Sequence, residues 1–541
     1  MGAVSRTVGD LLDRNAERYP DRQAIVCEKT TLTYAELKTR VDLLARGLLS
    51  VGVKKGDHVA LLMDNRPEWL LVCHAAAKLG AVLVPINIRY RLHELTYLLT
   101  NARPLVLILI DRFHQANFIE MLFELDPKLR NSPQGAVKSE RFKSLRHIFC
   151  LSEQEYPGMT RWVEVLERAG EASPTDLSVA QKRITPEDLI YILYTSGTTA
   201  MPKGAMLSHS NLCQHGENIA VRLHATPQDR FWIPIPLFFS FACANALMTA
   251  LNAGATLVLQ PFFDPEEALA LIEKERCTIL YANPSIYLPL LDHPRRKTFD
   301  LSSLRSGIAM GTAQNLRRVA EELGVTQINS GYGLTETSAI CTMTDCQDPL
   351  EFRIQTFGRP FPGVEVVIKD PDSEKRLPPL GEGEIRVKGY NVTRGYYDDP
   401  EKTAASFDKE GFFCTGDIGS LTQQGYLQFK GRYKDMLKIS GINVSAVEVE
   451  SFLEAYPGVQ EVHLCGIPDV VKDEVGVAFV KVSGGAVVKE EDLFLFCKQN
   501  IASYKIPKFI RFLDDFPRTG SGKVKKFELR ERFLQTLKEK K

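Results

Sequence analysis

The sequence lacks several features that would assign a protein to a class at once. Its 541 residues carry 67 Lys and Arg against 67 Asp and Glu, so no charge excess favours nucleic acid or an anionic membrane. The eleven cysteines include no Cys-x-x-Cys pair, and the ten histidines show no His-Glu-x-x-His spacing. We therefore expect neither a disulfide framework nor a structural zinc site. Scattered cysteines are typical of reduced thiols in a cytoplasmic protein.

Long hydrophobic runs are also scarce. One stretch, Phe231–Leu251, approaches the length of a membrane span, but Pro234 and Pro236 interrupt it and charged residues flank its start. This pattern predicts the end of a strand, then a loop and a buried helix. The first six residues form no apolar segment, so we expect no signal peptide, no stable membrane insertion and a cytoplasmic location.

What is present is the composition of an ordinary globular protein, with 44% apolar and 25% charged residues. Strand-like and helix-like segments alternate over most of the chain, as in strand Gln23–Cys27, helix Tyr34–Ser50 and strand His58–Met63. Such alternation predicts an α/β protein with helix-covered, mainly parallel sheets. Between Gly363 and Lys388 the pattern changes to short strands and turns, which predicts a β-rich subdomain.

The last part of the chain is predicted to be a separate small α+β domain. Its expected helices and strands are Ser445–Ala455, Val459–Ile467, Val475–Val482 and Glu490–Asn500. Residues 500–541 contain 12 Lys and Arg but 5 Asp and Glu, a surplus of +7. Such a surplus is typical either of a solvated helix face or of a lid over a polyphosphate or coenzyme A.

A stretch rich in glycine and hydroxyl groups, Tyr194-Thr-Ser-Gly-Thr-Thr-Ala-Met-Pro-Lys-Gly204, is the most informative part of the sequence. It follows the apolar strand Ile190–Tyr194 and precedes a helix predicted to begin near Ser208. Glycines let the backbone approach an anion, hydroxyl groups can donate to phosphate oxygens, and Lys203 adds a positive charge. The alternative is a polar surface turn. Because Lys203 precedes Gly204, the stretch is not the P-loop of kinases and GTPases.

Four further motifs follow in order along the chain. They are Gly331-Tyr-Gly-Leu-Thr-Glu-Thr337, Thr415-Gly-Asp417, Gly431-Arg-Tyr-Lys-Asp435 with Lys438 and Gly441, and Pro517-Arg-Thr-Gly-Ser-Gly-Lys523. Together with the stretch at 194–204 they resemble the adenylate-forming superfamily of acyl-CoA ligases, beetle luciferases and peptide-synthetase adenylation domains. The resemblance implies an AMP-binding domain at 1–433, a hinge at Lys434 and a mobile lid domain at 434–541.

The resemblance also implies a reaction in two steps that uses ATP, Mg²⁺ and coenzyme A. A carboxylate attacks the α-phosphate of ATP to give an acyl-adenylate and pyrophosphate, and the thiol of coenzyme A then displaces AMP. Because a carboxylate and a polyphosphate repel each other, catalysis of the first step must consist mainly of charge neutralisation and alignment.

By the same resemblance, each motif implies roles for individual residues. The phosphates are expected to lie against Thr195, Ser196, Gly197, Thr198, Thr199 and Lys203. The adenine and ribose are expected to lie against Gly311, Thr312, Ala313, Tyr332, Gly333, Asp417 and Arg432. Three residues are the predicted catalytic ones: Glu336 as the Mg²⁺ ligand, Thr335 at the α-phosphate and Lys523 between the carboxylate and the α-phosphate. Coenzyme A is expected to meet Lys438 and Gly441 after the lid turns.

The acyl pocket is expected to be apolar and roomy. Its predicted lining residues are Phe238, Phe239, Ala242, Gly307, Ala309 and Met310. Gly333 is expected to leave space where acetate-specific relatives have tryptophan. A buried methylene contributes about 0.8 kcal/mol, so such a pocket favours an alkyl chain or a ring. The absence of an acid from Phe231 to Leu251 argues against an amino-acid substrate. A medium- or long-chain fatty acid is predicted, with an aromatic or alicyclic acid as the alternative.

The sequence leaves open other activities that proteins of the same fold carry out. An acyl-AMP ligase would load a carrier protein instead of coenzyme A, a luciferase shares every motif, and a silent binding protein would have lost its catalytic residues. The presence of Glu336, Asp417 and Lys523 argues against the last of these. The expected partners are a small carboxylic acid, ATP and coenzyme A, without nucleic acid. A homo-oligomer is compatible with the sequence.

Overall fold

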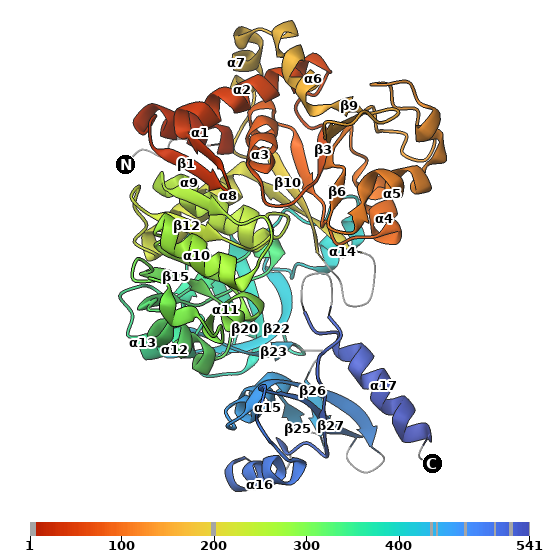
Figure 1. Cartoon of the computed structure of the whole chain (residues 1–541). Coiled ribbons are helices and arrows are strands. Elements are labelled where there is room, and N and C mark those ends of the chain that lie inside the picture. Colours follow the sequence, from red (N-terminus) through yellow and green to blue (C-terminus); the bar gives the residue numbers. More distant parts are fainter. Residues whose placement is uncertain are drawn as a thin grey trace. The chain divides into compact units, whose positions relative to one another are not determined.

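The computed structural model describes residues 7–195, 202–432, 436–439, 442–469, 473–501, 505–518 and 523–539 (Figure 1). They form two compact units: the first runs to Glu365 and includes Val387–Phe413, and the second comprises Val366–Arg386 and the chain from Cys414 onward. The predicted α/β class with a separate C-terminal part is confirmed. Residues 366–386 and 414–432 group with the second unit, although the sequence placed them in the domain at 1–433. The predicted hinge, Lys434, lies outside the described residues.

Two seven-stranded sheets form the centre of the first unit. One has the order β16 (Gln327–Asn329), β15 (Ser306–Ala309), β14 (Ile279–Ala282), β12 (Arg230–Ile233), β13 (Thr256–Leu259), β1 (Gln23–Cys27), β2 (Thr30–Thr33). The other has the order β11 (Lys203–Ser208), β10 (Leu189–Thr195), β4 (Val82–Pro85), β3 (His58–Leu62), β5 (Val106–Ile110), β8 (His147–Leu151), β9 (Thr160–Arg161). Neighbouring strands are parallel except at the edges, where β2 and β11 run antiparallel to their partners. The mainly parallel sheets predicted from the sequence are therefore confirmed.

Helices separate these strands along the chain, as the alternating pattern predicts. They are α1 (Val8–Arg18), α2 (Tyr34–Ser50), α3 (Pro67–Leu79), α4 (Leu92–Ala102), α5 (Phe118–Leu125), α6 (Trp162–Glu167), α7 (Pro174–Lys182), α8 (His209–Arg222), α9 (Leu247–Ala253), α10 (Pro265–Glu275), α11 (Pro284–Leu291), α12 (Ala313–Glu322), α13 (Leu350–Gln355) and α14 (Pro400–Ala405). The helix predicted over Tyr34–Ser50 has those bounds. Its start is fixed by a capping box, in which Thr33 Oγ1 accepts from the Glu36 N–H at 3.2 Å and the Glu36 carboxylate accepts from the Thr33 N–H at 2.8 Å.

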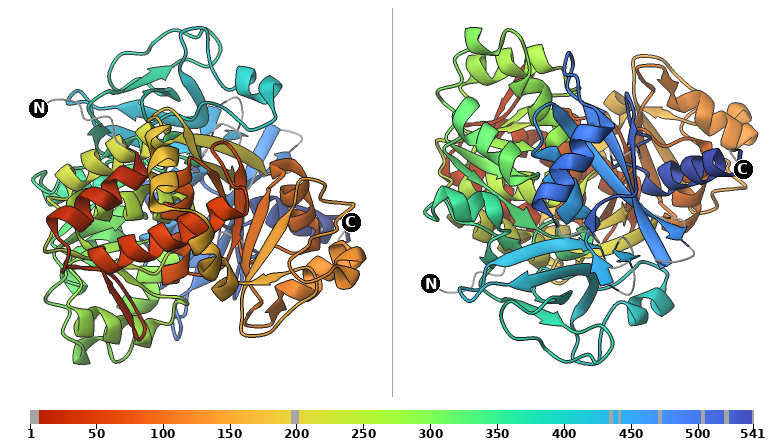
Figure 2. Two further views of the ribbon diagram at one scale, coloured as in Figure 1. Left: turned by 90° about the horizontal axis from the view of Figure 1, so that it is seen from above. Right: turned by 90° about the horizontal axis from the view of Figure 1, so that it is seen from below.

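A buried lysine joins the first three helices, which pack against one another (Figure 2). Lys78 of α3 has a side chain that is only 1% exposed, and its Nζ lies 2.5 Å from a carboxylate oxygen of both Asp13 and Asp42. A buried cation needs such partners because desolvation disfavours a lone charge. The ion pairs therefore fix the packing of α1 and α2 on α3.

The apolar stretch at 231–251 folds as predicted. Strand β12 ends at Ile233, a loop follows, and a buried helical segment continues through a π-helix (Phe241–Ala246) into α9. Across the part of the chain that the structure describes, no helix has both the length and the apolarity of a membrane span. All eleven cysteines lie within the described residues, and none of them forms a disulfide bond.

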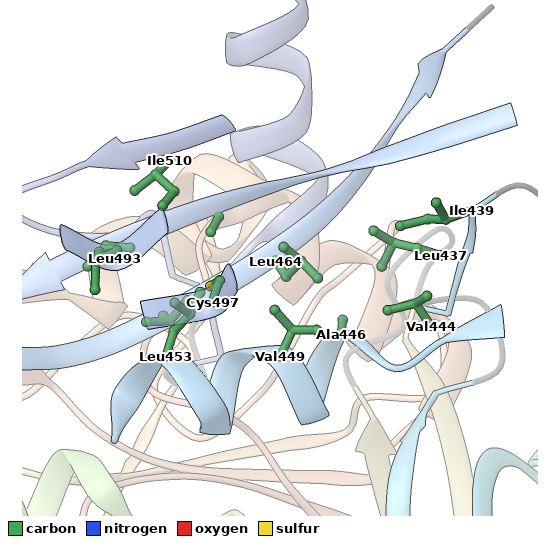
Figure 3. Close-up of a cluster of buried hydrophobic side chains, with 13 residues drawn as sticks. Leu437, Ile439, Val444, Ala446, Val449, Leu453, Leu464, Leu493, Cys497 and Ile510 are labelled. Atoms are coloured by element: carbon green, nitrogen blue, oxygen red, sulfur yellow. The ribbon is translucent and has the colours of Figure 1, made fainter. Parts of the chain in front are cut away.

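The second unit contains two further sheets and a hydrophobic core of its own. Strands β20 (Val364–Lys369), β21 (Gly383–Gly389), β22 (Phe413–Leu421) and β23 (Leu427–Arg432) form one sheet, and the first three cross the boundary between the units along the chain. The second sheet comprises β24 (Leu437–Ile439), β25 (Ile442–Val444), β26 (Val459–Asp469), β27 (Asp473–Val482) and β28 (Phe509–Phe512). Its helices are α15 (Ala446–Glu454), α16 (Glu490–Asn500) and α17 (Lys526–Glu539). Figure 3 shows the core in which Leu453, Leu464 and Leu493 meet.

A carboxyl group at the end of α15 makes the stability of this unit depend on pH. Burial, reinforced by the nearby charges of Glu450 and Glu461, raises the pKa of Glu454 from 4.5 to about 8, while a hydrogen bond from the Val462 N–H opposes the rise. The folded state therefore binds more protons than the unfolded state between these values. Stability is fully present below pH 4.5 and falls as the pH rises toward 8.

Glu454→Gln imitates the protonated side chain and should remove this loss. We expect the variant to match the wild type at about pH 4 and to be more stable at about pH 9, by on the order of 1 kcal/mol or more. Hydrogen exchange of α15 and β26 at the two pH values measures the difference within this unit. If the difference in stability between the variant and the wild type were equal at both pH values, the pKa of Glu454 would not be raised.

Candidate functional site

The glycine- and hydroxyl-rich stretch connects two antiparallel strands, β10 and β11. Thr195 and Lys203 pair across the hairpin, and the Thr195 hydroxyl donates to the Lys203 carbonyl at 3.5 Å. The helix predicted near Ser208 begins at His209, with Ser208 as its N-cap. Strand β11 was missed, because six residues after a loop rich in Gly and Thr carry little strand signal. Four residues predicted to bind phosphate lie outside the described residues: Ser196, Gly197, Thr198 and Thr199.

Glu336 lies in a short 3-10 helix, Thr335–Thr337, whose surroundings fix it from two sides. Its carboxylate Oε1 accepts a hydrogen bond from the Tyr396 hydroxyl at 2.8 Å, and its carbonyl accepts from the Thr393 N–H at 2.6 Å. The fully buried Asn391 donates its side-chain amide to the carbonyls of Thr337 at 3.0 Å and Ile340 at 3.2 Å. The turn that carries Glu336 is thus held in one conformation.

The neighbouring Thr335 brings a second oxygen group to this place. Its Oγ1 lies 3.2 Å from Oγ of Ser240, a residue that the sequence analysis did not select. Both side chains, like that of Glu336, are partly exposed. A carboxylate and two hydroxyl groups are oxygen donors, the type that Mg²⁺ prefers. The donor types are compatible with the metal role expected of Glu336, which stays a prediction; among the described residues, no group of three or more His, Cys, Asp or Glu side chains could hold a metal ion.

Tyr396 connects Glu336 to Lys203, and the sequence analysis missed it. The Lys203 Nζ lies 4.8 Å from the centre of the Tyr396 ring, whose hydroxyl binds Glu336. Burial, and then the Glu336 carboxylate, raise the pKa of Tyr396 well above its usual value, so the hydroxyl stays protonated and donates. The aromatic pair Tyr396–Tyr397 before the acidic turn Asp398–Asp399 is the one sequence signal that could have indicated it.

The predicted adenine residues lie on two segments of the first unit. Tyr332 is in β17 (Gly331–Tyr332), is 6% exposed and meets Phe357 edge to face at a ring separation of 6.5 Å. Gly311, Thr312 and Ala313 connect β15 to α12, and Thr312 is the N-cap of that helix. Gly311 has φ of +153°, and a side chain there would collide with the Tyr287 hydroxyl, so this position requires glycine. Their contact with adenine stays a prediction.

The predicted ribose residues lie opposite each other in the second unit. The register of β22 and β23 pairs Asp417 with Arg432, although the motifs that contain them are separate in the sequence. Asp417 is 2% exposed, and its N–H donates to the Thr415 hydroxyl at 3.1 Å. Glu384 accepts from the Gly416 N–H at 2.9 Å, which fixes the turn before Asp417. The arrangement is compatible with the predicted role of both residues.

The predicted residues of the lid also belong to the second unit. Lys523 is exposed, and the neighbouring Val524 forms a β-bridge with Arg518. Lys438 lies in β24 opposite Asn443 of β25. Gly441 lies outside the described residues. The roles of these lysines stay predictions.

The predicted pocket residues are apolar and mostly buried. Phe238 and Phe239 pack against each other with ring centres 4.6 Å apart, and Ala242 and Ala309 are fully buried. Met310 is partly exposed, and its carbonyl accepts from the Tyr287 hydroxyl at 2.9 Å. These side chains can offer an apolar surface, but their joint contact with a substrate is a prediction.

Gly333 and Gly307 do not leave room for the acyl group, contrary to the prediction from the sequence. A Cβ at Gly333 would lie 2.5 Å from both the Ala339 carbonyl oxygen and the Ile340 Cα, and a Cβ at Gly307 would collide with the Leu280 carbonyl. In both places the backbone of a neighbouring segment fills the space. These glycines permit close backbone contact and do not mark a vacant pocket.

A side chain at position 333 should therefore displace the turn that carries Glu336. We expect Gly333→Ala to lower kcat/KM about tenfold, and by the same factor for short and long acids, because overpacking against backbone costs ~1–3 kcal/mol. Steady-state kinetics with acetate, decanoate and palmitate measure the effect. A selective loss for long acids would instead place residue 333 at the acyl chain.

Comparisons with known proteins agree with the arrangement of these motifs. The AMP-binding enzyme family matches residues 12–397, and the AMP-binding enzyme C-terminal domain matches residues 448–523. The chain is 36% identical over 537 residues to YngI of Bacillus subtilis (strain 168), named provisionally as an acyl-CoA synthetase, with 98% of each chain covered. It is 33% identical over 546 residues to the mitochondrial medium-chain acyl-CoA ligase ACSF2 of Rattus norvegicus, covering 99% of this chain and 89% of that protein.

Two solved structures are also similar to nearly the whole chain. ATP-bound MatB from Rhodopseudomonas palustris is 30% identical, with a TM-score of 0.83 and coverage of 97% of this chain and 99% of MatB. The anthranilate CoA ligase AuaEII in complex with anthranoyl-AMP is 27% identical, with a TM-score of 0.85 and 98% of each chain covered. The similarity thus extends over nearly the full length of this chain.

Proposed function

We propose that this chain, which belongs to the AMP-binding enzyme family, acts on a medium- or long-chain fatty acid. It is an ATP-dependent acyl-CoA ligase of that family. It is an acid–thiol ligase that forms AMP, so its substrates are a carboxylic acid, ATP and coenzyme A. The observation that carries the proposal is the joint position of Lys203 and Glu336 on Tyr396. A triphosphate requires a cation and its counter-ion requires a carboxylate, and both groups contact the same tyrosine here.

Charge neutralisation explains the roles that we propose for the first unit. Lys203 binds the β- and γ-phosphates with the hydroxyl groups of the 195–199 loop, and Thr335 binds the α-phosphate. Glu336 would hold Mg²⁺ through carboxylate oxygen, and the bound ion would neutralise the triphosphate and align it for in-line attack. The Asn391 side chain holds the Glu336 turn through two hydrogen bonds, and a turn held in this way needs little reorganisation during the reaction.

The second unit contributes further groups in this proposal. Asp417 accepts hydrogen bonds from the ribose hydroxyls, with Arg432 opposite it in the sheet. Lys523 neutralises the attacking carboxylate and the α-phosphate in the adenylation step. Lys438 and Gly441 serve the second step, in which coenzyme A displaces AMP. A turn of the lid domain at 434–541 about Lys434 would exchange Lys523 for Lys438 and Gly441.

The identity of the acid is supported by relatives and by side-chain chemistry. The rat relative is named as a medium-chain ligase, and the paired rings of Phe238 and Phe239 suit an apolar substrate. AuaEII is named as a ligase of an aromatic acid, so an aromatic acid is the second candidate. A cytoplasmic location belongs to the same proposal and rests on eleven cysteines that form no disulfide bond, whereas the rat relative is named as mitochondrial.

A screen of pyrophosphate release over carboxylic acids tests the proposal. Acetate, hexanoate, decanoate, palmitate, benzoate and cyclohexanecarboxylate are compared at equal concentration, with and without coenzyme A. We expect the highest kcat/KM for decanoate or palmitate, with AMP release that depends on coenzyme A. Preference for benzoate would establish the aromatic alternative. AMP release that requires a carrier protein in place of coenzyme A would overturn the proposed acceptor.

A further inference from the structure

The segment Tyr390–Tyr397, which follows β21, connects two parts of the proposed site that are far apart in the sequence. On one side it holds the turn of Glu336, through the Asn391 side chain and the Thr393 N–H. These contacts fix both the backbone of the turn and the place from which the Glu336 carboxylate projects.

On its other side the same segment extends the sheet at β11. The Met206 N–H donates to the Gly395 carbonyl at 3.1 Å, the Tyr397 N–H donates to the Gly204 carbonyl at 2.8 Å, and Ala205 forms a β-bridge with Tyr396. Since Lys203 begins β11, its position depends on this pairing. One segment therefore sets the distance between the strand of Lys203 and the turn of Glu336.

Tyr396 is the side chain at which the two parts meet. It is 6% exposed, its hydroxyl donates to Glu336 Oε1 at 2.8 Å, and its ring faces the Lys203 ammonium at 4.8 Å. We infer that Tyr396 is a positioning residue of the adenylation step, which fixes one Glu336 carboxylate oxygen, leaves the other for Mg²⁺, and holds Lys203 beside it on the face of its ring. The inference rests on the proposed roles of Glu336 and Lys203.

Two physical arguments support this role over simple packing. A hydrogen bond to a carboxylate is stronger than one between neutral groups, so it restricts the rotation of Glu336 before any ligand binds. In addition, the Lys203 ammonium and the Glu336 carboxylate would neutralise each other if they formed an ion pair with each other instead of contacting Tyr396. The tyrosine gives each charge a neutral partner, and both charges stay available to ATP and its metal ion.

Tyr396→Phe removes the hydroxyl and keeps the ring, so it tests the link to Glu336 alone. The readout is the affinity for ATP by calorimetry without carboxylic acid, once with Mg²⁺ and once with EDTA. We expect the affinity in EDTA to be unchanged and the gain in affinity on adding Mg²⁺ to shrink roughly tenfold. Tyr396→Leu also removes the ring and should weaken binding in EDTA.

Tyr397→Phe is the matched control. It makes the same chemical change one residue later, where the hydroxyl instead accepts from Arg103 at 3.2 Å. We expect this variant to keep the wild-type gain in affinity on adding Mg²⁺. If Tyr397→Phe reduced the gain in ATP affinity as much as Tyr396→Phe, the inference would be overturned. The effect would then come from a general disturbance of the segment 390–397 and not from the hydroxyl that binds Glu336.

A double-mutant cycle with Glu336→Gln separates the inference from the proposed function. If Tyr396 acts through Glu336, Tyr396→Phe adds no further loss in the Glu336→Gln background. Additive losses, or a Tyr396→Phe variant with a normal response to Mg²⁺, would overturn the inference while the metal role of Glu336 stands. A normal response to Mg²⁺ in Glu336→Gln alone would overturn both.

Discussion

Glu336→Gln should slow acyl-adenylate formation on the order of a thousandfold or more, with the fold intact. The amide oxygen of Gln can still accept from the Tyr396 hydroxyl, and the Thr393 contact involves only the backbone of residue 336, so the turn should keep its shape. What the variant loses is the negative charge that would bind Mg²⁺. Pyrophosphate release at a series of Mg²⁺ concentrations measures both the rate and the metal requirement.

Glu321→Gln supplies the control for this experiment. Glu321 is an exposed residue of α12 that pairs with Arg317 on the same helix at 3.7 Å. Its neutralisation should therefore change neither the rate of pyrophosphate release nor the Mg²⁺ requirement. A Glu336→Gln enzyme with a near-normal rate and an unaltered Mg²⁺ dependence would mean that Glu336 merely stabilises the turn. The metal ligand would then have to be sought elsewhere.

The regular elements could be predicted because burial leaves a pattern in the sequence. The run Val106–Ile110 is apolar throughout and forms a strand buried on both faces, while helix α2 has a capping box at its start and apolar residues at helical spacing. Strand β2 was missed because it is short, and both β2 and β11 lie at sheet edges. Edge strands alternate in burial and contain polar residues, so they resemble loops.

The site could be predicted only in part, for a different reason. Glycine in a sequence shows that a side chain is absent but not what takes its place, and at Gly333 and Gly307 the neighbouring backbone does. The contact between Tyr396 and Glu336 joins residues 60 positions apart, and no spacing in the sequence indicates it. By contrast, the resemblance to a family selected Asp417 and Arg432 independently, and the register of β22 and β23 pairs them.

Lys523→Ala should separate the two half-reactions. If Lys523 serves only adenylation, its loss should slow acyl-adenylate formation on the order of a hundredfold or more and leave thioester formation from supplied acyl-adenylate nearly unchanged. Next to Lys523, Val524 forms a β-bridge with Arg518, and the Lys525 N–H donates to the Pro517 carbonyl at 2.8 Å. These are backbone contacts, so removing the Lys523 side chain should leave them in place.

The alternative is that Lys523 is one surface cation among many in a basic lid. Lys525→Ala tests it, because Lys525 lies two residues away and has the same charge, while its ammonium is 3.7 Å from a Glu528 carboxylate oxygen. A general electrostatic role predicts similar losses for both variants, in both half-reactions. A specific role predicts that Lys525→Ala behaves as the wild type.

Lys434→Pro tests the proposed hinge, since proline fixes the backbone torsion there. It should spare adenylation and slow thioester formation. Single-turnover assays of each half-reaction give the answer, and equal losses in both halves for Lys523→Ala and Lys434→Pro would contradict alternation of the lid.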